Sequence, residues 1–297
     1  MRLRANRSSQ VGMAVITAML LVTLAATTAT FLLWRQQLWL RQVESIAARA
    51  QADALARATI EWKLRAGPGG AAAPFAEAGA IETVVSDPQG LFNLNNLVRA
   101  GKPSEPDIDV FRRLLGMLKL PGALADSLLD AIDSDSEATF PGGAEDLDYL
   151  AMEPPRRAPN RLLLDVSSLG RIKGFTTEVI SRLAPYVTAL PEHTAVNINS
   201  APAEVLRALI PGLDEGAARA IVAERSRKAF DSVEAFRAKL PDLVRPPANI
   251  ALGISSAYYI VASRVQLERA VAHHRALIGG RGARHEGILW RTEGFDG

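Results

Sequence analysis

The chain has 297 residues, a formal net charge of +2 and no cysteine, and 48% of its residues are apolar. So small a net charge gives little attraction for nucleic acid, and the lack of cysteine excludes disulfides and zinc–thiolate sites. The length allows one large domain or two modest domains with a real hydrophobic core.

The first predicted element is a helix that begins in a membrane. The run from Met13 to Trp34 has no charge over about 22 residues, which is enough to cross a bilayer. Arginines at positions 2, 4 and 7 precede it without any acidic residue, which places the N-terminus in the cytoplasm and the body in the periplasm. Residues 35–65 are helix-favouring and amphipathic, so one continuous helix is predicted from about Met13 to Leu64.

Three interpretations of this N-terminus are open. It could be a cleaved secretory signal with a small-residue site near Ala25, or a plain single-pass anchor. The third rests on a resemblance: the basic leader, Gly12, the sequence Met13-Ala14-Val15-Ile16 and the long helix resemble a type IV pilin-like leader. The resemblance implies cleavage between Gly12 and Met13 by a prepilin peptidase, followed by N-methylation of Met13.

The fifth residue of such a mature chain would be Thr17, where most pilin-like proteins have glutamate. In that family the glutamate pairs with the terminal amine of the subunit ahead in the filament. A subunit at the tip of the filament has no subunit ahead of it and therefore no amine to pair with. The K-type minor pseudopilins of type II secretion share this exception, so the resemblance implies a tip position.

Beyond the helix, a loop rich in glycine and proline at residues 67–80 precedes a predicted strand at 81–87. A turn at 88–90 and a short strand at 91–97 should follow. Further strands are predicted at 257–265, 270–278 and 288–291. Helices are predicted between them at 108–119, 122–132, 176–183, 201–209, 215–227 and 232–240.

Strands early and late with helices between them predict an α+β fold. The long N-terminal helix should pack on a small antiparallel, pilin-like sheet that carries a large inserted all-α domain. The expected boundaries are a leader at 1–12, the helix at 13–66, the sheet part at 67–101 and 249–297, and the insertion at 102–248, with a helix-hairpin-helix or SAM-like unit at 194–245.

An acidic stretch at residues 126–153 is the most chemically distinctive part of the chain. It holds nine carboxylates, and no lysine or arginine occurs between Lys119 and Arg156. The stretch could be a solvated acidic loop. It could also bind calcium, which takes six to eight oxygen ligands from flexible acidic loops. The spacing is not that of an EF-hand. Candidate ligands are Asp133, Asp135, Glu145, Asp146 and Asp148, with Pro141-Gly142-Gly143 folding the chain back between them.

The same stretch resembles the K-type pseudopilins. The matching segments are 129–135, 143–146 with Tyr149, 90–97, 158–161, 165–169 and 173–175, and they follow the order of that family. The resemblance implies that the chain binds structural calcium through the acidic stretch.

Residues 194–206 resemble the start of a helix-hairpin-helix DNA-binding module, with residues 210–217 at its hairpin. In that module a glycine-containing turn and the next helix N-terminus hold a phosphate. Asp214 and Glu215 stand there instead, and their carboxylates would repel a phosphate. We therefore expect a helical packing unit in which Asn197 and Asn199 make structural hydrogen bonds.

The chain carries no recognisable catalytic motif. Its four histidines form no H-E-x-x-H pair, and no G-x-S-x-G or phosphate-binding loop occurs. Adjacent His273 and His274 on a strand should face opposite ways. An anchored hydrolase using the acidic cluster is one alternative. An anchored helix-hairpin-helix DNA-binding protein is another. We predict that the chain is not an enzyme and binds no nucleic acid.

Taken as a whole, the resemblance implies a minor pseudopilin of a type II protein secretion system. It would be a single-pass inner-membrane protein with its body in the periplasm, at the tip of the pseudopilus, where it primes assembly for the export of folded proteins. The implied partners are the I- and J-type minor pseudopilins, the major pseudopilin, the inner-membrane assembly platform and prepilin peptidase.

Overall fold

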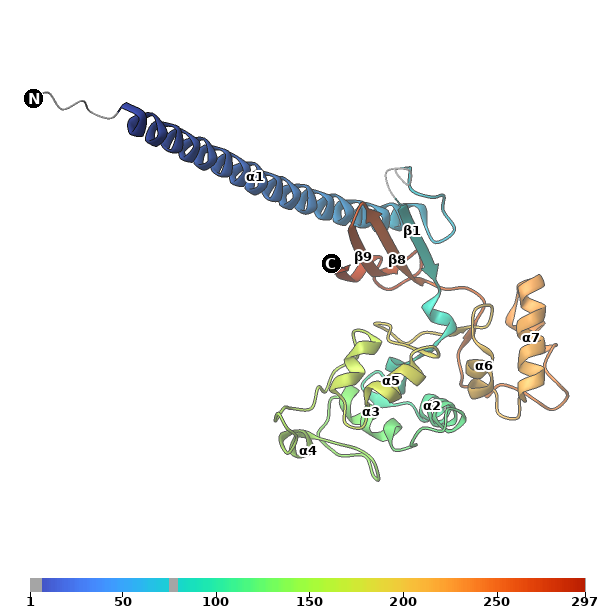
Figure 1. The fold of residues 1–297 in the computed structure, drawn as a ribbon. Coiled ribbons are helices and arrows are strands. Elements are labelled where there is room, and N and C mark those ends of the chain that lie inside the picture. Colours follow the sequence, from blue (N-terminus) through green and yellow to red (C-terminus); the bar gives the residue numbers. More distant parts are fainter. Residues whose placement is uncertain (1–6, 75–79, 297) are drawn as a thin grey trace, which may run out of the picture.

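The computed structural model describes residues 7–74 and 80–296, which form a long helix, a four-stranded sheet and a helical region (Figure 1). Helix α1 (Arg7–Ala66) has 60 residues and extends about 90 Å at 1.5 Å per residue. It begins before the predicted start at Met13, and leader residues 1–6 lie outside the described residues.

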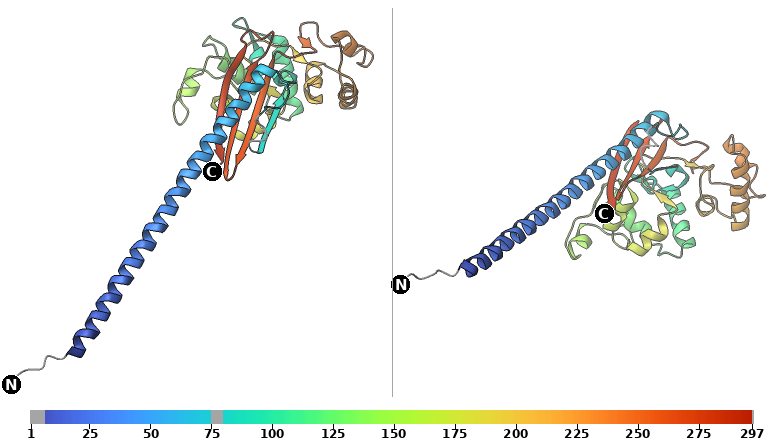
Figure 2. Two further views of the ribbon diagram at one scale, coloured as in Figure 1. Left: turned by 90° about the horizontal axis from the view of Figure 1, so that it is seen from above. Right: turned by 45° about the horizontal axis from the view of Figure 1, so that its top comes forward.

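The first half of α1 projects away from the rest of the molecule, as both views in Figure 2 show. Every residue from Met13 to Ala47 is exposed, although much of this surface is apolar. By length and composition this is a helix that could cross a membrane. Within the described part of the chain, no other segment packs against the uncharged run.

The sheet has four antiparallel strands in the order β1-β8-β9-β10. They are β1 (Ala80–Ser86), β8 (Tyr258–Leu267), β9 (Ala270–Gly279) and β10 (Gly287–Asp296). The register of β9 and β10 shifts between Ile288 and Trp290, which marks a bulge. One strand thus comes from before the helical region and three come from after it, as the early and late strand patterns predicted.

The second half of α1 packs on one face of this sheet through small side chains. Ala52 and Ala56 are fully buried against Val265 and Ala272. One turn further along, Ile60 packs into a cluster that includes Val261, Ala276 and Ile278. The alanines let the helix approach the strands closely, so the amphipathic half of the predicted helix is the half that the sheet covers.

The helical region lies between β1 and β8 and is built mainly from short helices. The α-helices are α2 (Glu105–Met117), α3 (Leu124–Ile132), α4 (Asp146–Leu150), α5 (Thr177–Leu183), α6 (Ala203–Leu209), α7 (Glu215–Arg227) and α8 (Val233–Arg237). The 3₁₀ helices are η2 (Pro88–Gly90), η3 (Leu94–Leu97) and η4 (Val166–Arg171). Three two-residue strand pairs join its loops: β2 (Phe92–Asn93) with β5 (Val187–Thr188), β3 (Val98–Arg99) with β4 (Lys102–Pro103), and β6 (Val196–Asn197) with β7 (Leu252–Gly253).

One hydrophobic cluster runs through the helical region from Phe92 to Ile250. Helix α2 contacts both α3 and α6, so the hairpin-like unit of α6 and α7 shares its core with the rest of the region.

The strand predicted at 91–97 is wrong for most of its length. Only Phe92 and Asn93 form a strand, and residues 94–97 form the 3₁₀ helix η3. The reason is that asparagine side chains replace a backbone ladder here. Asn95 Nδ2 donates to Leu163 O (2.9 Å) and Leu190 O (2.8 Å), and its Oδ1 accepts from Leu163 N (2.9 Å).

Polar side chains after β1 also join the sheet to the helical region. Asp87 Oδ2 accepts from Asn197 Nδ2 (2.8 Å), Ser200 Oγ (2.5 Å) and Ser256 Oγ (2.7 Å). Gln89 Oε1 accepts from the backbone at the start of β8. Bonds between buried or partly buried groups hold two elements in one geometry, so the helical region is fixed where the chain leaves and re-enters the sheet.

Candidate cation site in the acidic loop

The acidic stretch folds around one buried carboxylate, that of Asp130 in α3. Asp130 accepts hydrogen bonds from the backbone N–H of Thr139 (3.0 and 3.1 Å) and of Ala144 (2.8 Å). Gly143 passes so close that a Cβ there would lie 2.1 Å from Asp130 Oδ2 and 2.5 Å from the Thr139 backbone. Only glycine fits, and the loop therefore returns Glu145 towards the end of α3.

This return brings together three of the five predicted ligands. Carboxylate oxygens of Asp133, Asp135 and Glu145 all lie within 4.8 Å of one another. Asp133 and Glu145 are buried, whereas Asp135 is exposed. Asp133 Oδ1 and both Glu145 oxygens are buried without any hydrogen-bond partner among the described residues. We call these three residues the acidic-loop cluster.

The electrostatics of the acidic-loop cluster favour a bound cation. Burial, followed by the carboxylates of Asp135, Asp130 and Glu145, raises the pKa of Asp133 to about 7. Burial, followed by the Asp130 carboxylate, also raises the pKa of Glu145. No arginine or lysine of the described chain forms an ion pair with the three carboxylates. A hard divalent cation would relieve the repulsion and satisfy the orphaned oxygens.

Asn160 is a further oxygen donor, one that the sequence did not single out as a ligand. Its Oδ1 is buried and has no partner among the described residues, while its Nδ2 donates to the backbone oxygen of Asp135 (3.0 Å). Its side chain also lies near enough to Glu145 to lower the pKa of that carboxyl, against the larger effect of burial. The only sequence feature that pointed to Asn160 was its place after Pro159, in the segment 158–161 that resembles the K-type pseudopilins.

The other two predicted ligands, Asp146 and Asp148, make different contacts. Asp146 Oδ1 accepts from the backbone N–H of Ala158 (2.9 Å). Asp148 forms an ion pair with Lys173 (2.7 Å), and this hydrogen bond lowers the pKa of Asp148. Its second oxygen accepts from Glu145 N (3.4 Å). Both side chains therefore position α4 beside the loop.

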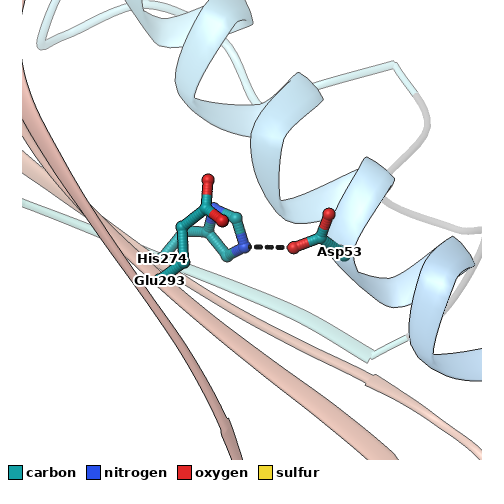
Figure 3. A group of neighbouring side chains, drawn as sticks. All are labelled: Asp53, His274 and Glu293. Atoms are coloured by element: carbon teal, nitrogen blue, oxygen red, sulfur yellow. Dashed lines mark hydrogen bonds and ion pairs between the residues drawn. The ribbon is translucent and has the colours of Figure 1, made fainter.

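A second group with metal-ligand chemistry lies between α1 and the sheet (Figure 3). It consists of Asp53 on α1, His274 on β9 and Glu293 on β10, with atoms within 4.8 Å of one another. The His274 side chain is fully buried, and its Nε2 lies 2.8 Å from Asp53 Oδ1. Figure 3 shows the imidazole of His274 facing Asp53. The alternation of side chains along β9 places His273 on the other face of the sheet, as predicted.

Arginines already neutralise this second group. Arg57 Nε lies 3.0 Å from Asp53 Oδ2, and Arg57 Nη2 lies 3.1 Å from Glu293 Oε2. Arg291 Nε lies 3.0 Å from Glu293 Oε1. Every carboxylate oxygen therefore has a cationic or imidazole partner, and a metal ion would have to displace an arginine. The group is best described as a helix–sheet clamp.

The hairpin unit contains an internal replacement for a bound phosphate. Gly212 has a positive φ of 84°, as a tight turn requires. Asp214 then caps α7, because its Oδ1 accepts from Ala217 N (2.8 Å). Its carboxylate occupies the helix N-terminus that would otherwise hold an anion. Asn199 donates to Phe230 O (2.9 Å) and Ile254 O (3.1 Å), as predicted for a structural residue.

Two comparisons with known sequences give a consistent result. Family models described as "Type II secretion system (T2SS), protein K" match residues 90–192 and 196–254. The type II secretion system protein K of Pseudomonas aeruginosa is 33% identical over 288 residues, which cover 88% of this chain and 86% of that protein. The protein K of Aeromonas hydrophila is 28% identical, over 84% of this chain and 87% of that protein.

A solved structure has the same fold. It is the crystal structure of the GspK-GspI-GspJ complex from the enterotoxigenic Escherichia coli type 2 secretion system. The match has a TM-score of 0.65 and 26% sequence identity, and it covers 88% of this chain and 99% of the matched chain. The long helix, antiparallel sheet and helical region thus recur together. None of these comparisons supports the DNA-binding alternative.

The helix–sheet clamp generates a testable prediction. Asp53→Ala leaves the buried His274 Nε2 without its acceptor, so we expect a loss of about 2 kcal/mol in the free energy of unfolding. Glu61→Ala is the matched control, because Glu61 is an exposed acidic residue of the same helix. Urea unfolding of the detergent-solubilised chain measures both. Equal effects of the two substitutions would refute the clamp, as would a zinc-induced rise in the melting temperature of the unsubstituted chain.

Proposed function

Because this chain belongs to the type II secretion system protein K family and is a minor pseudopilin of that system, we propose that it caps the tip of the pseudopilus. There it assembles with the I- and J-type minor pseudopilins, primes growth of the filament of major pseudopilin and so contributes to export of folded proteins. The match to a chain of the GspK-GspI-GspJ complex supports these partners. As a pseudopilin it is a structural component, and we propose that it catalyses no reaction.

The observation that carries the proposal is the uncovered apolar surface of α1. The described residues Met13–Ala47 are all exposed, so this membrane-anchored helix must be surrounded by lipid or by other helices. Sibling helices can replace lipid around it without a change in the rest of the fold. The arginines before Met13 support an inner-membrane orientation with the body in the periplasm.

Thr17 supports the tip position. Its Oγ1 donates to the carbonyls of Met13 (2.9 Å) and Ala14 (3.0 Å), so the hydroxyl is satisfied within its own helix. It offers no negative charge to the amine of a subunit ahead. The helical region also adds bulk beyond the sheet, which would crowd neighbouring subunits along the side of a helical filament.

Processing follows from the same proposal. A prepilin peptidase on the cytoplasmic side would cut between Gly12 and Met13, which lie within α1, and Met13 would be methylated. Removal of the basic leader frees the apolar end of the helix for extraction from the bilayer. The assembly platform of the inner membrane would perform that extraction.

We also propose that the acidic-loop cluster binds structural calcium. Asp133, Asp135 and Glu145 supply carboxylate oxygens, and Asn160 supplies an amide oxygen. The donor set is entirely oxygen, which suits calcium better than a transition metal. Asp146 and Asp148 support the site through the contacts that hold α4.

The processing prediction is checked by mass spectrometry of the native N-terminal peptide. In cells with prepilin peptidase we expect a peptide beginning at methylated Met13, and in cells without it the uncut leader. Gly12→Val should block cleavage because it changes the residue before the scissile bond, whereas Gly69→Val, in an exposed loop, should be cut normally. If the N-terminal peptide still begins at Met1 in cells with the peptidase, the segment is a plain membrane anchor and the processing proposal is wrong.

The tip position predicts one copy of this chain at one end of each filament. We would tag the C-terminus of the full chain and label filaments assembled with excess major pseudopilin, which lengthens them. The ratio of this chain to the major pseudopilin should fall as filaments lengthen. A tag on the major pseudopilin should decorate the whole length. Label from this chain spread along the filament would contradict the tip proposal without affecting the processing result.

Calcium should raise the melting temperature of the detergent-solubilised full chain, and a chelator should reverse the rise. At 100 times the dissociation constant, binding adds about 2.7 kcal/mol to stability. Asp133→Asn should abolish the calcium-dependent rise, because it removes a charged ligand. Asp109→Asn, at an exposed position in α2, is the control and should keep it. A melting temperature indifferent to calcium and chelator would refute the site.

A further inference from the structure

The sheet face turned away from α1 is only partly covered. The register places its side chains in rows across the four strands. The first row is packed beneath Leu190 of the helical region, and the next two rows are not. The first row is Ser86, Ile260, Leu277 and Trp290, the second is Val84, Ala262, Arg275 and Thr292, and the third is Glu82, Arg264, His273 and Gly294.

The uncovered rows form the floor of a groove. A cavity of about 450 Å³ lies over the second and third rows. A second cavity, of about 230 Å³, lies between the first row and the helical region. Both are lined by Arg275 and Thr292, so they are adjacent. We call them together the outer-face groove. Its floor is partly apolar, since Val84 remains 54% exposed.

The outer-face groove contains two exposed arginines and one buried indole N–H. Arg275 lies over the Trp290 ring at 5.8 Å and has no ion-pair partner in the described chain, and neither has Arg264. Trp290 Nε1 is buried and has no hydrogen-bond partner there. Two cations and an indole N–H thus surround a partly apolar floor.

Within the described residues, the carboxylates that line the groove do not form ion pairs with Arg264 or Arg275. Glu293 is paired with Arg57 and Arg291 instead. Asp165 accepts from the N–H of Ser168 (3.0 Å) and from Ser167 Oγ (2.6 Å). Glu82 faces Arg264 across the β1–β8 pair, but forms no ion pair within the described chain. His273 also lines the groove. Trp290 Nε1 therefore has no acceptor within the described chain, and the exposed guanidinium groups of Arg264 and Arg275 are accessible to an acidic ligand.

We propose that the outer-face groove binds an extended acidic segment of a partner polypeptide. Carboxylates of the segment would pair with Arg275 and Arg264, and its apolar side chains would cover Val84 and Trp290. Three inter-strand spacings span about 14 Å, which accommodates four or five extended residues at about 3.3 Å each. A nucleic acid, by contrast, requires many more phosphate contacts than two guanidinium groups provide.

The groove faces away from α1, the surface through which sibling helices would pack. Sibling helices are therefore excluded as the occupant of the groove, and only this step rests on the proposed function. The ligand chemistry of the groove does not depend on calcium or on the tip position. The occupant is therefore a partner outside the helical bundle of the pseudopilus.

The test uses the full chain in lipid nanodiscs and the peptide Glu-Val-Glu-Val-Glu-amide with fluorescein on its N-terminus, and fluorescence anisotropy is the readout. The same peptide with glutamine for glutamate is the ligand control. We expect only the acidic peptide to bind. Arg275→Gln should weaken binding about tenfold, because it removes one charge-assisted pair. Arg281→Gln, an exposed arginine beyond the groove, is the matched control and should leave binding unchanged.

A second variant guards against a folding defect in Arg275→Gln. Val84→Glu places a negative charge on the exposed floor of the groove and should also abolish binding while the melting temperature is kept. Absence of binding to the unsubstituted chain would overturn the proposal. So would equal binding of the glutamine peptide, or an equal loss in Arg281→Gln. Displacement of the peptide by a short single-stranded oligonucleotide that binds more tightly would assign the groove to nucleic acid instead.

Discussion

The structure depends on one constraint, that the uncharged half of α1 has nothing of its own chain to cover it. Burying a single leucine, valine or isoleucine side chain contributes about 1.5–3 kcal/mol, and the run from Met13 to Trp34 exposes many of them. This half of the helix is therefore stable only in lipid or among other helices. It cannot pack on the sheet face that accepts α1, because that face is already covered by Ala52, Ala56 and Ile60.

Two clusters of carboxylates show how the same residue type serves different ends. In the helix–sheet clamp, Arg57 and Arg291 stand beside Asp53 and Glu293, so the charges balance within the chain. In the acidic-loop cluster no arginine or lysine of the described chain pairs with the carboxylates, and burial raises the pKa of Asp133. The decisive difference is that arginine side chains pair with the carboxylates of the clamp, whereas no basic side chain of the described chain pairs with those of the acidic-loop cluster. A clamp must hold without any ligand, whereas a ligand site must leave its charges unsatisfied.

Much of the fold could be predicted from the sequence, because its signals are local. Uncharged length predicts the membrane helix, and β-branched alternation predicts strands near 81–87 and 257–265. The strand predicted at 91–97 rests on its place after a turn, whereas Asn95 bonds to Leu163 and Leu190, far away in sequence. No local pattern reveals such partners. The end of β10 was missed because it lacks the usual apolar alternation.

The candidate site was predictable in composition but not in geometry. The sequence showed that carboxylates were abundant near Asp133, and it could not show which of them converge. Asp130 proves to be a scaffold residue because backbone N–H groups of the returning loop bond to it. Asp148 is drawn away by Lys173, which lies 25 positions further along the chain. The unpartnered amide oxygen of Asn160 could not be predicted from its residue type, since its burial depends on contacts with segments distant in sequence.

These separate features suggest that the two halves of the molecule are stabilised independently. The acidic-loop cluster lies between α3 and α4, within the helical region, and none of its residues contacts α1 through a hydrogen bond or ion pair in the described chain. The clamp and the alanine packing instead hold α1 on the sheet. A cation would therefore stiffen the helical region without altering the packing of α1 on the sheet. The helix can then exchange lipid for sibling helices while the part of the chain that it carries stays rigid, held to the sheet through Asp87 and Gln89.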